Sequence, residues 1–278
     1  MKIFYCLALL AFGQAEIITG RKCTGENYKF EKEVLVTGYD SPYQLAIDPA
    51  TNTLFFSYSI QTLGEGFKSV YLDLKTKHHE EIPVNGGGFA HAVDVNNNIV
   101  YIGSTESGIS KFDYQTKKAV PLDITKEGIW QMFYKDGLYF TTYPKENAYV
   151  YKDGVVKKIE EFDGTRALTL GVDNHHNIFF SNSSGLFVYK KDDEVILQAG
   201  DHIVNAFTSD SQGNLFFSTP FGLYSVDSKL KIKEILEENN IYGMAIEGEN
   251  TIIYATKDNV IRLKLSSECS LSINDIQK

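Results

Sequence analysis

The sequence predicts an all-β protein, a six-bladed β-propeller, and three observations lead to this fold class. A pattern of two apolar strands joined by a polar turn recurs six times along the 278 residues. The 17 Tyr and 18 Phe residues form an aromatic excess that favours strands over helices. Asn, Gly and Asp interrupt the pattern every few residues, which argues against stacked helical repeats.

The repeat is defined by one aromatic residue in the second strand of each unit. These residues are Phe56, Tyr101, Phe140, Phe180, Phe217 and Tyr254, with spacings of 45, 39, 40, 37 and 37. An acid ends the first strand at Asp48, Asp94, Asp173, Asp210 and Glu247, whereas the third copy has Phe133 at this place. A period near 40 with several short strands per unit is typical of a propeller, because one blade cannot bury its own faces.

The two ends of the chain predict how the ring closes. After the sixth copy, "NVIRLKL" (259–265) supplies a third strand but no fourth one follows, while "FEKEVLVTG" (30–38) precedes the first copy. We therefore expect the N-terminal strand to complete the last blade. This arrangement would bring Cys23 and Cys269 to one seam, where we predict a disulfide; the alternative is two unrelated buried thiols.

The N-terminus has the features of a secretory signal. Lys2 precedes the apolar run "IFYCLALLAF", which is too short to span a bilayer, and "GQA" provides small residues at a cleavage site after Ala15. We expect residues 1–15 to be a signal peptide and residues 16–278 to be a single propeller domain, extracellular and monomeric. The sequon at Asn182 predicts glycosylation. A net charge of −9 disfavours binding to nucleic acid or anionic membranes.

The loops that lead into the six first strands should gather on one face of the ring, around the central channel. They are rich in flat rings with a few polar groups, which suits a planar conjugated ligand. The predicted ligand-binding residues are Tyr43, Phe89, His91, Trp130, Arg166, His202, Asn205 and Tyr242. Arg166 would neutralise a carboxylate or sulfate of the ligand. The alternative is that Trp130 plugs the channel as core and Arg166 pairs with Asp163.

Motifs for enzymatic catalysis are mostly missing from the chain. It contains no G-x-S-x-G, H-E-x-x-H, calcium-loop or phosphate-loop motif, and we expect neither a cofactor nor a metal site. "NGGGF" (85–89) has no following helix and is interpreted as a flexible channel loop. The strand rhythm also resembles the gluconolactonase and senescence-marker class, which implies metal-dependent lactone hydrolysis as the alternative function. Asp40, Asp163 and Asp201 do not reproduce the metal-binding motifs of that class.

A closer resemblance covers the whole chain. A signal segment ending at "FGQA", the following "RKCTGENY", an acidic body of this size and one cysteine near each end resemble the ommochrome-binding proteins of insect haemolymph. That family consists of secreted pigment carriers of moths, and its ligands are planar, tryptophan-derived, anionic chromophores. The resemblance implies that the partner is an ommochrome pigment, that the protein is not an enzyme and that it circulates in haemolymph.

Overall fold

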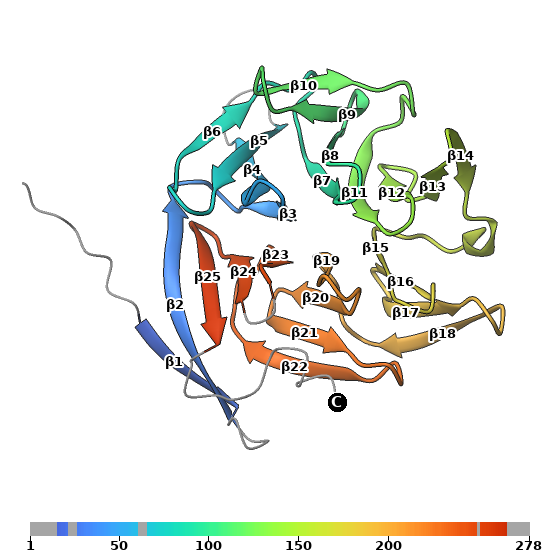
Figure 1. The fold of residues 1–278 in the computed structure, drawn as a ribbon. Helices are drawn as coiled ribbons and strands as arrows, with labels where there is room; N and C mark the ends of the chain where they lie inside the picture. The colour runs from blue at the N-terminus through green and yellow to red at the C-terminus, as the bar shows by residue number, and fades with distance from the viewer. Residues whose placement is uncertain (1–15, 22–26, 61–65, 249–250, 266–278) are drawn as a thin grey trace, which may run out of the picture.

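A computed structural model of the chain confirms the six-bladed β-propeller (Figure 1). The structure describes residues 16–21, 27–60, 66–248 and 251–265. The predicted signal peptide (residues 1–15), Cys23 and Cys269 lie outside these residues, so the cleavage site and the disulfide remain predictions. Among the described residues, no helix is long and apolar enough to cross a membrane.

Each blade is an antiparallel meander whose first strand lies at the axis of the ring (Figure 1). Blade 1 contains β3 (Tyr43–Asp48), β4 (Thr53–Ile60), β5 (Gly66–Asp73) and β6 (His79–Ile82). Blade 2 contains β7 (Ala90–Asp94), β8 (Ile99–Ser104), β9 (Gly108–Asp113) and β10 (Lys118–Pro121). Blade 3 contains β11 (Ile129–Tyr134), β12 (Leu138–Thr142), β13 (Ala148–Lys152) and β14 (Val155–Lys158), and a 3-10 turn, η1 (Glu160–Phe162), follows it.

The second half of the ring repeats this arrangement. Blade 4 contains β15 (Thr169–Val172), β16 (Ile178–Asn182), β17 (Gly185–Lys190) and β18 (Val195–Gly200). Blade 5 contains β19 (Ala206–Ser209), β20 (Leu215–Thr219), β21 (Gly222–Val226) and β22 (Ile232–Glu237). Blade 6 contains β23 (Gly243–Ile246), β24 (Thr251–Ala255), β25 (Asn259–Leu265), β2 (Asn27–Thr37) and β1 (Glu16–Arg21).

Blade 6 closes the ring in the predicted way. β2 pairs antiparallel with β25, from Phe30 opposite Leu265 to Thr37 opposite Asn259. The sequence did not predict β1, which pairs with β2 as a fifth strand and covers its outer edge (Figure 1).

The repeated residues of the sequence have two structural roles. The six second-strand aromatics are all buried between blades, and four of them have no exposed surface. In the four copies that have Asp, the acid caps the turn that follows it. Asp173 accepts hydrogen bonds from the backbone N–H groups of His175 and Asn177 at 2.8 and 2.9 Å, and from Asn177 Nδ2 at 2.8 Å. Asp210 makes the same set of bonds. The third copy has a tighter turn, in which the Lys135 N–H donates to the Gly137 carbonyl at 2.9 Å.

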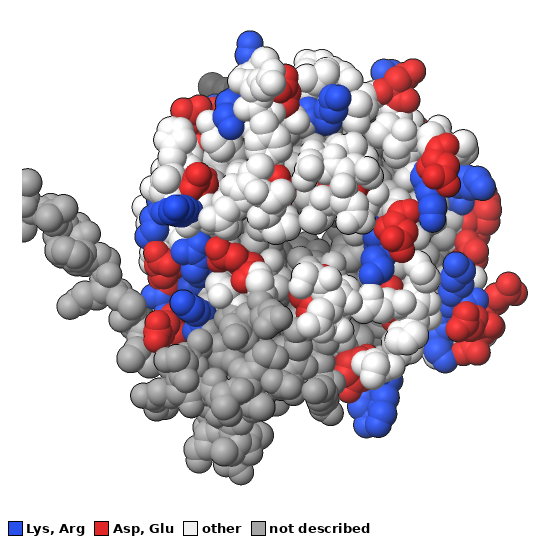
Figure 2. All heavy atoms as spheres, viewed as in Figure 1, with Lys and Arg blue, Asp and Glu red and all other residues white. Residues whose placement is uncertain are grey.

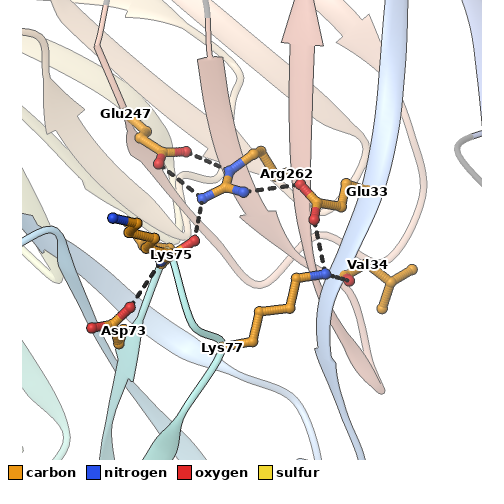
Figure 3. Close-up of polar contacts among 8 residues, drawn as sticks. Glu33, Val34, Asp73, Lys75, Lys77, Glu247 and Arg262 are labelled. Carbon is orange, nitrogen blue, oxygen red and sulfur yellow. Dashed lines mark hydrogen bonds and ion pairs between the residues drawn. The ribbon is translucent and has the colours of Figure 1, made fainter. Parts of the chain in front are cut away.

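A cluster of charged residues crosses the seam between blade 6 and blade 1 (Figure 3). Arg262 of β25 donates to Glu247 at 2.6 and 2.9 Å, to Glu33 of β2 at 2.9 Å, and to the carbonyl of Leu74 in blade 1 at 2.9 Å. Lys77 of blade 1 lies 2.8 Å from the other oxygen of Glu33. We call Glu33, Lys77, Glu247 and Arg262 the seam network. It joins β2, near the start of the chain, and β25, near its end, to the first blade.

Candidate functional site

One face of the ring carries the loops into the inner strands and the turns between second and third strands; we call it the loop face. The inner strands pack closely beneath it: residues of β19 lie within 8 Å, Cα to Cα, of both β3 and β11, each two blades away. The axis is therefore narrow at this level. A ligand of several fused rings would have to bind at the mouth of the channel and not inside it.

Six aromatic side chains from four adjacent blades form a continuous cluster on the loop face. We call this cluster the aromatic arc; its members are Tyr43, Phe67, Phe89, Trp130, Tyr143 and Tyr242. Four of them were predicted from the sequence as ligand-binding residues, and the structure brings these four together. Phe67 was missed, and Tyr143 was not among the predicted binding residues.

The rings of the arc follow one another at contact distance. Tyr43 lies 5.3 Å from Tyr242 and 5.8 Å from Phe89, centroid to centroid. Phe89 lies 4.8 Å from Trp130, and Trp130 lies 5.1 Å from Tyr143 with an angle of 32° between the ring planes. Separations of this size are those of favourable ring contacts in proteins.

The arc is graded from buried to exposed. Phe89 is only 2 % exposed and lies at its base, whereas Tyr143 is 50 % exposed at its blade 3 end. Tyr43, Trp130 and Tyr242 are partly buried between these extremes. In the view of Figure 2, charged side chains lie mainly around the rim of the ring and uncharged side chains lie nearer its centre.

Two register shifts in the inner strands change the direction of side chains of the arc. The register of β11 against β12 shifts between Ile129 and Gln131, so Trp130 is the extra residue of a β-bulge. The register of β3 against β4 likewise shifts after Tyr43, where Gln44 has a φ of 52°. Bulges reorient a side chain relative to the regular alternation of a strand. Ile129 and Gln131 are consequently buried, while Trp130 remains partly exposed.

The glycine segment before Phe89 packs tightly, in contrast to the flexible channel loop that the sequence suggested. A Cβ on Gly87 would lie 2.6 Å from the Phe67 carbonyl oxygen, and one on Gly88 would lie 2.1 Å from Ser69 Oγ. Glycine is required at both positions because the backbone approaches its neighbour so closely. This approach places Phe89 against Phe67, with ring centroids 4.2 Å apart.

Arg166 lies beside the blade 3 end of the arc. Its side chain is 73 % exposed, and Nε is 3.6 Å from Oε2 of Glu146, in the turn that also carries Tyr143. The alternative pairing with Asp163 is wrong, because the carboxylate of Asp163 pairs with Lys158. Because this ion pair is long and engages Nε, the guanidinium keeps further N–H donors for an anionic ligand.

His91 does not reach the loop face, although the sequence placed it among the ligand-binding residues. It is 3 % exposed, its Nδ1 lies 3.0 Å from the Gln44 carbonyl and its Nε2 lies 2.9 Å from Ser69 Oγ. Because a carbonyl can only accept, Nδ1 carries the proton and Nε2 accepts from the serine hydroxyl. Burial lowers the pKa of His91 to about 4, outweighing the opposite effect of the Gln44 carbonyl.

This buried histidine predicts a loss of stability in mild acid. Folded His91 stays neutral between pH 7 and pH 5, while the unfolded residue gains a proton near its ordinary pKa of 6.5. The free energy of unfolding should therefore fall by about 2 kcal/mol over this range because of His91. Denaturant titrations at both pH values should show a smaller fall in His91→Gln, whereas the exposed control His176→Gln should match the wild type. Equal pH dependence in all three proteins would contradict this assignment.

The remaining two predicted residues lie away from the arc. His202 is partly buried against Tyr224 and Phe217, at centroid distances of 4.8 and 5.6 Å, and this burial lowers its pKa. The Asn205 amide donates to the Ile241 carbonyl at 2.6 Å. Asn205 therefore fixes the backbone next to Tyr242 and contributes no ring to the arc.

Among the described residues, no three His, Cys, Asp or Glu side chains come close enough together to hold a metal ion. The adjacent histidines of the two His-His pairs are exposed.

By its fold, the chain is a six-bladed propeller of the type found in gluconolactonases. A putative gluconolactonase superimposes with a TM-score of 0.66 at 10 % identity, over 85 % of this chain and 92 % of that one. A gluconolactonase from Xanthomonas campestris gives a TM-score of 0.66 at 12 % identity, over 86 % and 90 % of the two chains. No protein-family model matches the sequence. At these identities the likeness concerns the fold alone.

The ommochrome-binding protein of Manduca sexta is 41 % identical over 252 residues, which cover 88 % of this chain and 90 % of that protein. The chain belongs to the ommochrome-binding protein family. This confirms the resemblance seen in the sequence.

Proposed function

We propose that the protein is a secreted, extracellular carrier that binds an ommochrome pigment at the aromatic arc on its loop face. The observation that carries this proposal is the continuous set of six rings beside an exposed guanidinium. The related protein from Manduca sexta is by name an ommochrome-binding protein, which supports an ommochrome as the ligand.

The physical basis of binding is ring contact combined with charge. A fused aromatic ligand gains from each ring that it covers, by burial of apolar surface and by favourable ring geometry. Partly buried rings whose neighbours already hold them in place lose little conformational freedom when the ligand binds. Arg166 provides the positive charge for an acidic group in a protein whose net charge is −9.

Binding can be tested with the purified, full-length secreted protein and a purified ommochrome. A carrier should retain the pigment's absorption band through dialysis and bind it in a saturable manner with one site per chain. Addition of a chelator should leave the absorption band unchanged. A lactonase should instead turn over lactones in a metal-dependent manner, and loss of the pigment on chelation, restored by calcium or zinc, would favour that alternative.

Replacing Arg166 should distinguish charged from uncharged ligands. Because the Arg166 side chain is 73 % exposed, its attraction to an anion is screened by water. We expect Arg166→Ala to weaken binding of the anionic pigment about two- to fivefold and to leave an uncharged analogue unaffected. Arg166→Lys should retain part of the effect. Titrations in low and high salt would show this difference, and an equal loss for both ligands would contradict a charge role.

A further inference from the structure

The amide of Asn182, the last residue of β16, makes two hydrogen bonds within the fold. Its Nδ2 donates to the backbone carbonyl of Arg166 at 2.9 Å, and its Oδ1 accepts from the Ser184 N–H at 2.8 Å. Nδ2 is also the atom to which an N-linked glycan would be attached. The nitrogen that holds the Arg166 loop is therefore also the nitrogen that would carry a glycan.

The position has the same role in another blade. Ser104, the last residue of β8, donates to the carbonyl of Gly86 at 2.9 Å and accepts from the N–H groups of Glu106 and Ser107 at 3.1 Å. In blades 2 and 4, then, the side chain of the last second-strand residue makes two kinds of hydrogen bond. It caps the turn that follows the strand, and it binds a backbone carbonyl in the loop that leads into the first strand of the same blade. Thr219 of blade 5 caps its turn in the same way, because its hydroxyl accepts a hydrogen bond from the Phe221 N–H at 3.1 Å. In these three blades a polar side chain at the end of the second strand has a structural role that does not involve a glycan.

In blade 4 the loop that is held is the one that carries Arg166. On the Ala167 side, the backbone N–H donates to the Glu146 carbonyl at 3.0 Å, in the turn that carries Tyr143. On the Arg166 side, the carbonyl accepts from Asn182. Two hydrogen bonds thus fix the peptide group that joins Arg166 to Ala167. The position of this peptide determines where the Arg166 side chain leaves the backbone beside the aromatic arc.

We propose that Asn182 is a positioning residue, carried as an unmodified amide, that holds the Arg166 loop in place for the anionic group of the ligand. The role in ligand binding rests on the proposed function. A glycan on Nδ2 would replace one of its two hydrogens and place a sugar against the Arg166 loop. The sequon in this chain is accordingly a by-product of the Asn and of the small polar residues of the turn.

Three variants distinguish the effect of the Asn182 amide from the effect of the sequon. Ser184→Ala removes the sequon but keeps Asn182 and the backbone N–H at residue 184. Asn182→Ser removes the sequon but supplies the hydroxyl that Ser104 provides in blade 2. Asn182→Ala removes both the sequon and the donor. All three should be secreted from a eukaryotic cell line together with the wild type.

Two measurements do not depend on any ligand. Intact mass spectrometry should show wild-type protein at its polypeptide mass, with no difference from Ser184→Ala beyond the substitution; a heavier, glycosidase-sensitive wild type would overturn the proposal. Amide hydrogen exchange in residues 165–168 should be accelerated at least severalfold in Asn182→Ala, and should stay close to wild type in Ser184→Ala and Asn182→Ser. Unchanged exchange in Asn182→Ala would also overturn it.

Ligand titrations then test the effect on the site. Asn182→Ala should weaken binding of the anionic ommochrome about two- to threefold, whereas Asn182→Ser should bind it as the wild type does. In an Arg166→Ala background, Asn182→Ala should cause no further loss of binding. An equal loss with and without Arg166 would show that Asn182 acts on the fold in general, contrary to the proposal. If wild-type protein binds no ommochrome, the proposed function fails, while the mass and exchange measurements still decide the role of the amide.

Discussion

Replacing Arg262 of the seam network by Leu is expected to lower the free energy of unfolding by about 3 kcal/mol. The side chain is only 17 % exposed, and its loss would leave Glu247, Glu33 and the Leu74 carbonyl without their shared donor. Breaking a buried pair by removing one partner typically costs about 3–5 kcal/mol, and the partial exposure places this case at the lower end.

Lys77→Ala is the matched control, because it removes a cation from the same network at an exposed position. Lys77 is 42 % exposed, and surface ion pairs typically contribute less than about 1 kcal/mol. Denaturant unfolding of both variants should place Arg262→Leu well below Lys77→Ala in stability. Equal effects would show that the seam does not depend on the buried guanidinium.

The contribution of the network should also depend on pH. Burial alone would raise the pKa of the Glu33 carboxyl, but hydrogen bonds and attraction from Lys77 and Arg262 outweigh it and hold the pKa below 4.5. A lowered carboxyl pKa stabilises the fold above the unfolded value, and this stabilisation is lost as the pH falls through the folded value. The difference in stability between wild type and Arg262→Leu should therefore shrink below about pH 4.5.

The fold could be predicted from the sequence because its signals are periodic. The buried aromatic recurs in every blade, an Asp that caps the following turn recurs in four of the six, and the missing fourth strand of blade 6 has one candidate at the other end of the chain. The seam network could not be predicted in the same way. Arg262 meets Glu33 because these two residues are directly opposite in the β2–β25 register, and the strand pattern alone does not fix that register.

The candidate site was only partly predictable, for reasons of side-chain direction. Phe89 precedes β7 and reaches the arc, whereas His91 lies within the strand and points between blades. Trp130 reaches the loop face through a bulge, a local irregularity that the apolar pattern does not reveal. Phe67 was missed because the predicted binding residues lie in the first strands and the loops into them, whereas Phe67 is the second residue of the third strand β5.

Trp130→Ala is expected to cause the largest loss of pigment binding. Trp130 is the largest ring of the arc and contacts both Phe89 and Tyr143. Losing its ring contact and the apolar surface that it buries against a flat ligand should cost about 2 kcal/mol, or roughly thirtyfold in Kd. The loss should be the same for an anionic ligand and an uncharged analogue, because ring contact does not discriminate charge. Trp130→Phe should fall between wild type and Trp130→Ala.

Phe221→Ala provides the control on the same protein. Phe221 is 66 % exposed in a second-to-third-strand turn of blade 5, outside the arc, so its loss should leave binding unchanged. Pigment absorbance is the suitable readout, since it does not require the tryptophan, and thermal unfolding should verify that each variant is folded. Wild-type binding by a folded Trp130→Ala, together with a loss in Phe221→Ala, would place the pigment on the opposite side of the mouth. Because the arc spans blades 6, 1, 2 and 3 while Phe221 belongs to blade 5, the two variants report on different halves of one face and decide between them.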